Sequence, residues 1–140
     1  MITAVGSTVI RKHHKATCHC GAVELDLHLP EGLVNLRRCN CSMCRRKGAI
    51  MASVPLDGLR VARGQDVLRI YQFNTRTARH YFCSFCGIYT HHQQRSDPSR
   101  YGFNVACLDG VDPFLLEPVS TSDGVNHPSD RIPAAAALQG

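Results

Sequence analysis

The sequence predicts a mostly β fold of short strands in a single domain, and three observations support this. At 140 residues with 44% hydrophobic side chains, the chain fits one domain and is long enough to bury a core. Residues 22–29 alternate apolar and polar side chains, which is the period of a half-buried strand. No segment sustains helical periodicity over three turns, so helices are expected to be short.

The strands are expected at regular intervals, separated by turn-forming residues. In the first, residues 22–29, the face that carries Val23, Leu25, Leu27 and Leu29 is expected to be buried, and Pro30–Gly32 ends the strand. Residues 42–48 predict one helical turn that stops at Gly48. The other predicted strands are residues 33–39, 50–55, 58–64, 67–74, 78–83, 88–94 and 102–108.

Three regions divide the chain. Residues 1–15 are predicted to be an irregular or edge-strand lead-in, residues 16–119 the domain that holds the cysteines, and residues 120–140 a loosely held C-terminal extension. The first residues lack the apolar core of a signal peptide, and no apolar run approaches the ~18 residues of a membrane span. We therefore predict a cytoplasmic protein, in which thiols are kept reduced.

Eight cysteines in a reduced setting need an explanation other than disulfides. Seven of them fall into three tight groups, which is how metal ligands cluster: Cys18 and Cys20; Cys39, Cys41 and Cys44; Cys83 and Cys86. The spacing matches neither common ferredoxin pattern, which argues against an iron–sulfur cluster. The groups therefore predict zinc.

The two pairs together supply four ligands. Cys83 and Cys86 form a C-x-x-C followed by Gly87, which is typical of a metal knuckle, and Cys18 and Cys20 are also followed by a glycine. A redox C-x-x-C is the alternative, but that motif works at the start of a helix, whereas a strand is expected after Gly87. The pairs predict a closed structural zinc site, here called the four-thiol site, which would close a loop of about sixty residues.

Cys39, Cys41 and Cys44 remain as a local three-thiol cup. Three protein ligands with an exchangeable fourth position are typical of a catalytic zinc, so the chain is expected to hold two Zn²⁺ ions. The alternative is that Cys107, His91 or His92 closes a second structural site. Cys107 alone is more typical of a buried core thiol, and the eight histidines are expected on solvated faces.

Basic side chains bracket the cup. They would favour thiolate over thiol and attract a carboxylate-bearing ligand, although each one alone is typical of a solvated surface: Arg37, Arg38, Arg45, Arg46 and Lys47. The formal net charge of +5 suggests an anionic partner, but seven bound thiolates and two zinc ions would lower it. The global charge is therefore weak evidence for nucleic-acid binding.

Four motifs in order, "CHCGAVEL", "RRCNCSMCRRKGA", "HYFCSFCGIYTHH" and "NVACLDG", resemble the glutathione-dependent formaldehyde-activating enzyme family, which also includes centromere protein V. The resemblance runs from about Cys18 to Gly110. It implies a β-tent of two layered antiparallel sheets held by zinc, with a structural zinc at the four-thiol site and a catalytic zinc at the three-thiol cup.

The same resemblance implies a carbon–sulfur lyase that joins formaldehyde reversibly to the thiol of glutathione. The basic side chains, Arg45 and Arg46 among them, would meet the carboxylates of glutathione. No residue stands out as a general acid or base; Asp109 and Tyr89 are candidates only because they are polar and lie near the motifs.

Two other functions remain open. In a binding module both zinc ions would be structural, and the basic stretch would contact nucleic acid or an acidic protein. The absence of Trp and the 6% aromatic content make stacking platforms sparse, which counts against nucleic acid. A metal-storage or redox-sensor protein would instead have a labile cup that oxidises readily.

Overall fold

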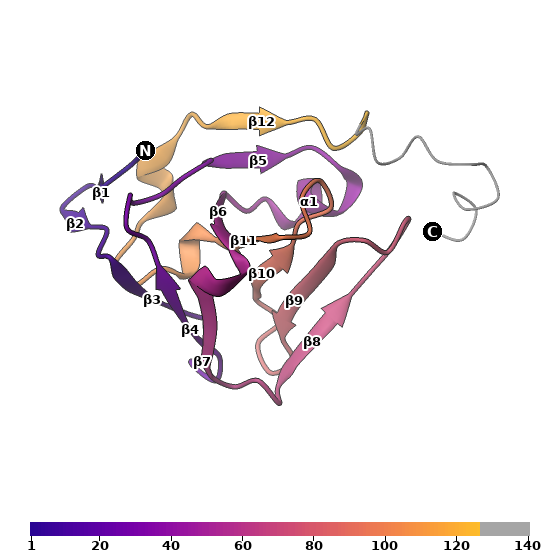
Figure 1. Cartoon of the computed structure of the whole chain (residues 1–140), viewed down its shortest axis with the longest axis horizontal. Helices are drawn as coiled ribbons and strands as arrows, with labels where there is room; N and C mark the ends of the chain where they lie inside the picture. Colours follow the sequence, from indigo (N-terminus) through magenta and orange to yellow (C-terminus); the bar gives the residue numbers. More distant parts are fainter. Residues whose placement is uncertain (127–140) are drawn as a thin grey trace.

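The computed structural model describes residues 1–126 and contains two main sheets. In Figure 1 the three-stranded sheet lies to the left and strands β8–β10 to the right, and the two converge where β7 is followed by β8. The helical elements are short: α1 (Ser42–Lys47), η1 (Leu56–Gly58), η2 (Val105–Cys107) and η3 (Pro113–Leu116). The predicted mostly β, single-domain fold is confirmed.

The larger sheet has seven strands in the order β12-β5-β6-β11-β10-β9-β8. Its neighbours are antiparallel except β12 and β5, which are parallel. The strands are β5 (Arg37–Cys39), β6 (Met51–Pro55), β8 (Leu68–Tyr71), β9 (Arg79–Cys83), β10 (Tyr89–Gln93), β11 (Arg100–Asn104) and β12 (Ser120–Ser122). β10 is paired on both edges, by β9 and β11, and four of its five residues are buried.

The smaller sheet has the order β3-β4-β7, and a separate hairpin precedes it. These strands are β3 (His13–Thr17), β4 (Glu24–His28), β7 (Leu59–Arg63), and, in the hairpin, β1 (Ala4–Val5) and β2 (Thr8–Val9). The lead-in predicted for residues 1–15 therefore contains this hairpin and the start of β3.

The core forms where the apolar faces of the strands meet. Leu25 and Leu27 on β4 are completely buried, as the alternating pattern predicts, whereas His28 is exposed. Burying each of these leucines contributes about 1.5–3 kcal/mol to the free energy of unfolding. They pack in one cluster with Phe103 of β11, which joins the two sheets through a common core.

Two predicted strands are shorter than the sequence suggests. Residues 33–36 lie outside β5, because Asn35 takes a positive φ of 59° and Leu33 pairs instead with Ile2. Residues 105–108 leave β11, because the Asn104 side chain accepts a hydrogen bond from the Ala106 N–H and starts the 3₁₀ turn η2.

The C-terminal extension expected from residue 120 is not loosely held at its start. Ser120–Ser122 form β12 and pair in register with Arg37–Cys39 of β5. Beyond the strand, the Asn40 side chain accepts hydrogen bonds from the N–H groups of Gly124 and Val125, at 2.8 and 3.2 Å. The rest of the predicted extension, residues 127–140, lies outside the described residues.

None of the helices within residues 1–126 combines the length and the apolar character needed to cross a bilayer.

Candidate functional site

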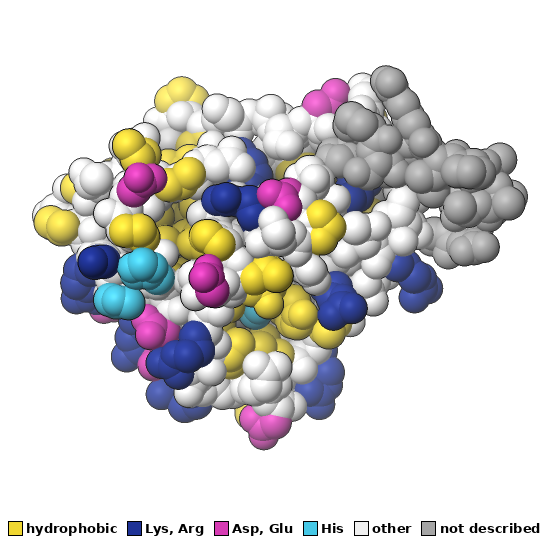
Figure 2. Space-filling view, in the orientation of Figure 1, with side chains coloured by type: hydrophobic (Ala, Val, Ile, Leu, Met, Phe, Trp, Pro, Cys, Tyr) yellow, Lys and Arg dark blue, Asp and Glu magenta, His cyan; other side chains and the backbone are white. Residues whose placement is uncertain are grey.

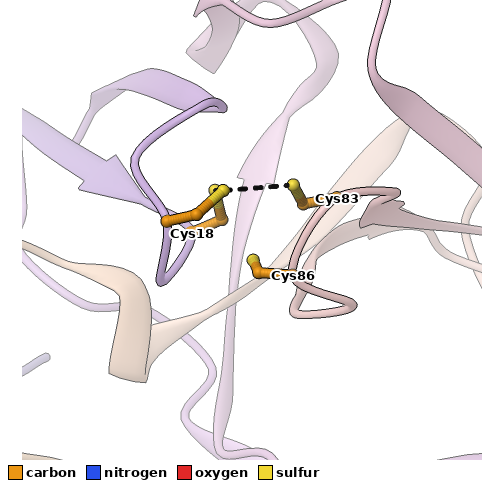
Figure 3. A group of neighbouring side chains, drawn as sticks. Cys18, Cys83 and Cys86 are labelled. Atoms are coloured by element: carbon orange, nitrogen blue, oxygen red, sulfur yellow. Dashed lines mark hydrogen bonds between the residues drawn. The ribbon is translucent and has the colours of Figure 1, made fainter.

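The four-thiol site joins the two sheets. Cys18 and Cys20 follow β3, Cys83 ends β9 and Cys86 precedes β10, and all four sulfurs lie within 4.8 Å of one another. Figure 3 shows Cys18 on one segment facing Cys83 and Cys86 on another. Sequence spacing thus predicted correctly which four thiols lie together.

The sulfur separations match a tetrahedral zinc site. The Cys20 sulfur lies 3.7 Å from the sulfurs of Cys18 and of Cys83. Four sulfurs at the usual Zn–S length of ~2.3 Å from one ion would be about 3.8 Å apart. The backbone N–H of Val23 also donates to the Cys18 sulfur at 3.3 Å, which stabilises a thiolate. The residues therefore fit a closed zinc site.

The three-thiol cup is assembled at the end of β5. Cys39 ends the strand, Cys41 is the N-cap of α1 and Cys44 lies in its first turn, and the three sulfurs are within 4.8 Å of one another. The Cys41 sulfur caps the helix by accepting a hydrogen bond from the Cys44 N–H at 3.3 Å. The first turn of α1 thus places the thiols of Cys41 and Cys44 beside the thiol of Cys39.

The group around the cup contains no fourth ligand from residues 1–126. Cys107 is buried elsewhere, where its thiol donates to the Tyr89 carbonyl at 3.7 Å and burial raises its pKa to about 12. His91 and His92 are also absent from the group. The structure therefore favours the open cup over the closed alternative.

A pocket of about 80 Å³ opens over the cup. Its volume is several times the ~10–15 Å³ that one water requires. All three thiols line it, and Phe73, His80 and His92 line it as well. Ser122 contributes from β12, and the next turn comes so close that a Cβ on Gly124 would lie 2.5 Å from the Cys39 sulfur. The C-terminal segment thus forms part of the pocket wall.

Of the five cations expected around the cup, Arg37 is among the residues that line the pocket. Arg37 and Arg95 line it, whereas Arg45 and Arg46 are exposed on α1 and are not among its lining residues. Arg46 donates instead to the Ser42 carbonyl at 2.8 Å. The structure therefore does not bring Arg45 and Arg46 to the pocket.

Arg37 is held mainly by neutral groups. Its guanidinium donates to the Ser53 hydroxyl at 3.0 Å and to the Asn35 carbonyl at 2.9 Å. Burial lowers its pKa. A half-buried cation that lines a pocket beside thiols favours an anionic ligand.

The expectation that the histidines lie on solvated faces is wrong for four of the eight. His14, His80, His91 and His92 are buried. His91 and His92 are consecutive on β10, so their side chains lie on opposite faces of the sheet. His91 packs against Tyr81 and Tyr101, and His92 packs against His80 and Tyr89, so both faces are covered. Most of these rings lie on neighbouring strands, and strand order cannot be read from the sequence, so the polar pair was expected to be exposed; no signal in the sequence marked His80 as a pocket residue.

Burial of His91 predicts a pH-dependent stability. Burial lowers the pKa of His91 to about 4, against a usual value of 6.5. Between pH 6.5 and 4 the unfolded chain binds more protons than the folded chain. The contribution of neutral His91 to the free energy of unfolding is therefore full above pH 6.5 and is lost as the pH falls towards 4, by at most ~1.4 kcal/mol per pH unit.

His91→Phe keeps a ring against Tyr81, which lies 4.4 Å from the imidazole between centroids. We expect urea unfolding of this variant to depend less on pH than that of the wild type between pH 6.5 and 4. Both proteins carry the same thiols, so the difference between their pH dependences reports on His91 alone. If the free energies of unfolding of the two proteins fall equally between pH 6.5 and 4, the lowered pKa of His91 is contradicted.

Comparison with known proteins adds two findings. The family described as "Glutathione-dependent formaldehyde-activating enzyme" matches residues 13–121, a range that includes the four-thiol site and the three-thiol cup. The chain is also similar to a solved Rhodobacter sphaeroides protein, a structural genomics target, with 57% sequence identity and a TM-score of 0.74. That match covers 77% of this chain and 99% of the other.

Proposed function

Since the chain belongs to the glutathione-dependent formaldehyde-activating enzyme family, we propose that it is a zinc-dependent carbon–sulfur lyase that joins or releases a small aldehyde at the thiol of glutathione or a similar molecule. The observation that carries the proposal is the open three-thiol cup at a pocket that Arg37 also lines. Three thiols that can bind a metal and a half-buried cation in one pocket suit a substrate that has both a thiol and a carboxylate.

Two zinc ions would have separate roles. Cys18, Cys20, Cys83 and Cys86 would hold the structural ion, and Cys39, Cys41 and Cys44 the catalytic ion. When bound at the cup, zinc would lower the pKa of a substrate thiol, so that thiolate is available near neutral pH.

The chain's own residues bind and orient the substrate. Arg37 would pair with a carboxylate of the thiol substrate, which would place the substrate's sulfur over the cup. The apolar Phe73 and Met51, together with the β12 segment, narrow the space and limit access of water. The small volume leaves room for an aldehyde of one or a few carbons beside the thiol.

The surface gives less support to the binding module. On the face drawn in Figure 2, Lys and Arg side chains lie among Asp and Glu. On the smaller sheet, Glu24 pairs with Lys15 at 3.3 Å and with Arg63 at 3.4 Å. Arg38, one of the basic residues predicted to bracket the cup, pairs with Glu117. Neutralised cations of this kind attract an anionic polymer weakly.

Titration calorimetry of the zinc-loaded protein tests the proposal. We expect glutathione to bind more tightly than cysteamine, which has the same thiol without carboxylates. Arg37→Gln, which keeps an amide donor for Ser53, should reduce this preference by about 10- to 100-fold if the contact is a charge-assisted hydrogen bond. Added salt should weaken glutathione binding in the same direction.

The double variant Arg45→Ala, Arg46→Ala is the matched control. Its two cations are exposed outside the pocket, so it should keep the preference of the wild type. If the double variant removes the preference for glutathione and Arg37→Gln does not, the carboxylates of glutathione bind at the surface of α1. Equal affinities for both thiols in the wild type, or no binding, would rule out the glutathione-like substrate and favour the binding module.

A further inference from the structure

Lys47 connects the end of α1 to His80 of β9. Its ammonium Nζ lies 3.0 Å from Nδ1 of His80. The same Nζ lies 3.5 Å from the centroid of the Tyr89 ring, which is buried. Burial lowers the pKa of Lys47, whereas the cation–π contact and the nearby thiols of the cup favour its charged form. The ammonium is therefore held between an aromatic face and an imidazole.

This contact fixes where the proton of His80 resides. A lysine ammonium has three donors and no acceptor, so Nδ1 must accept the hydrogen bond with its lone pair. The proton of the neutral imidazole then lies on Nε2. Burial, and secondly the nearby Lys47 charge, lower the pKa of His80 to about 4, so the ring stays neutral near pH 7.

The remaining nitrogen of His80 is accessible from the pocket. His80 is one of the residues that line the pocket with the three-thiol cup. No buried side-chain nitrogen or oxygen of residues 1–126 lacks a hydrogen-bond partner. Nδ1 contacts Lys47, and Nε2 has no hydrogen-bond partner within residues 1–126, so Nε2 is not fully buried, and the pocket that His80 lines is the space beside the ring that can hold a ligand.

The ring is also held in its orientation. His80 stacks between Phe73 and His92, with ring centroids 5.7 and 5.3 Å away. His92 is fixed in turn by the Tyr89 hydroxyl, 2.6 Å from its Nδ1. It also lies so close to β11 that a Cβ on Gly102 would come within 2.3 Å of its ring. A stacked ring of this kind keeps the direction of its N–H bond.

We propose that His80 donates its Nε2–H to the carbonyl oxygen of the aldehyde, and that Lys47 is a positioning residue that fixes the required tautomer. The inference rests on the proposed function and assigns a group to the aldehyde, whereas Arg37 is assigned to the thiol substrate. A fixed neutral donor stabilises the charge that develops on oxygen during addition.

The step balances without a further reactant. The thiol loses its proton to solvent, and its sulfur supplies the electron pair of the new S–C bond. The π pair of the C=O bond moves to the oxygen, where the His80 N–H donates a hydrogen bond. The resulting alkoxide takes a proton from water and gives the hydroxymethyl thioether. The reverse sequence releases the aldehyde.

Nitrogen NMR of the zinc-loaded protein tests the tautomer apart from activity. We expect His80 in the wild type to show a protonated Nε2 and an unprotonated Nδ1. Lys47→Met keeps most of the side-chain stem and removes the ammonium, so both tautomers should become populated. A protonated Nδ1 in the wild type, or an unchanged tautomer in Lys47→Met, would overturn the inference.

Kinetics with glutathione and formaldehyde test the role. His80→Phe keeps a stacking ring but removes the donor, and should lower kcat by about 10²–10³-fold, the usual cost of losing one such donor. His80→Gln, which returns an amide N–H, should recover part of the rate. Glutathione affinity should be unchanged in both variants, because His80 is assigned to the aldehyde.

The outcomes separate the two proposals. Wild-type protein that fails to bind glutathione, or binds it and forms no product, contradicts the proposed function. A wild-type enzyme that is active while His80→Phe retains its kcat contradicts only the role of His80. An equal loss of glutathione affinity in His80→Phe also contradicts that role, because it indicates a structural residue.

Discussion

Cys83→Ser is expected to unfold most of the chain at room temperature. Cys83 is completely buried and joins β9 to the segment after β3, so its loss opens the four-thiol site between the two sheets. A structural zinc contributes on the order of 10 kcal/mol to folding. That is comparable with the whole free energy of unfolding of a small domain, about 5–15 kcal/mol. Circular dichroism and zinc content measure the result.

Cys107→Ser is the matched control for this prediction. Cys107 is also buried, but it lies outside both metal groups, and a serine hydroxyl can still donate to the Tyr89 carbonyl. This variant should keep two zinc ions and lose at most a few kcal/mol of stability. A folded Cys83→Ser protein with the melting temperature of the wild type would rule out the structural role of the four-thiol site.

Cys41→Ser is expected to abolish the proposed lyase activity while the fold remains. It removes one thiol of the three-thiol cup, so the zinc content should fall from about two ions to about one. The helix should survive, because serine is a favourable N-cap and can accept the Cys44 N–H in place of the sulfur. Elemental analysis, a melting curve and a glutathione–formaldehyde assay measure the three quantities.

The comparison between the two cysteine variants decides whether the sites differ in role. The three thiols of the cup come from one short segment of the chain, so the metal cross-link lost in Cys41→Ser is local. If Cys41→Ser unfolds as completely as Cys83→Ser, then both ions are structural. In that case the three-thiol cup would no longer be evidence for a catalytic zinc site, and the proposed enzyme function would lose its main support.

The metal groups were predictable because their ligands are close in sequence. Cys39, Cys41 and Cys44 lie within six residues, and each pair of the four-thiol site is itself a compact motif. Only the pairing of Cys18 and Cys20 with Cys83 and Cys86 joins distant segments, and it was inferred because a closed zinc site requires four ligands. The alternation in residues 22–29 predicted β4 for a similar reason, since it depends on neighbours in the chain.

The pocket was not predictable, because its wall comes from segments distant in sequence. His80 on β9 and Ser122 on β12 meet the cup only through the order of strands in the sheet. Arg45 and Arg46 are adjacent to Cys44 in sequence, yet the helix turns them outward. Proximity along the chain therefore predicted well which thiols lie together, and predicted poorly which cations line the pocket.

The two sites also differ in when they can first exist during translation. All three thiols of the cup have been synthesised once Cys44 is added, whereas the four-thiol site waits for Cys83 and Cys86, about forty residues later. At ~5–20 residues per second, that interval is about 2–8 s. The thiols proposed to hold the catalytic ion are therefore synthesised before those proposed to hold the structural ion are complete, and before β12 can form its part of the pocket wall. An ion that bound during this interval would be selected by the three thiols alone and not by the folded pocket.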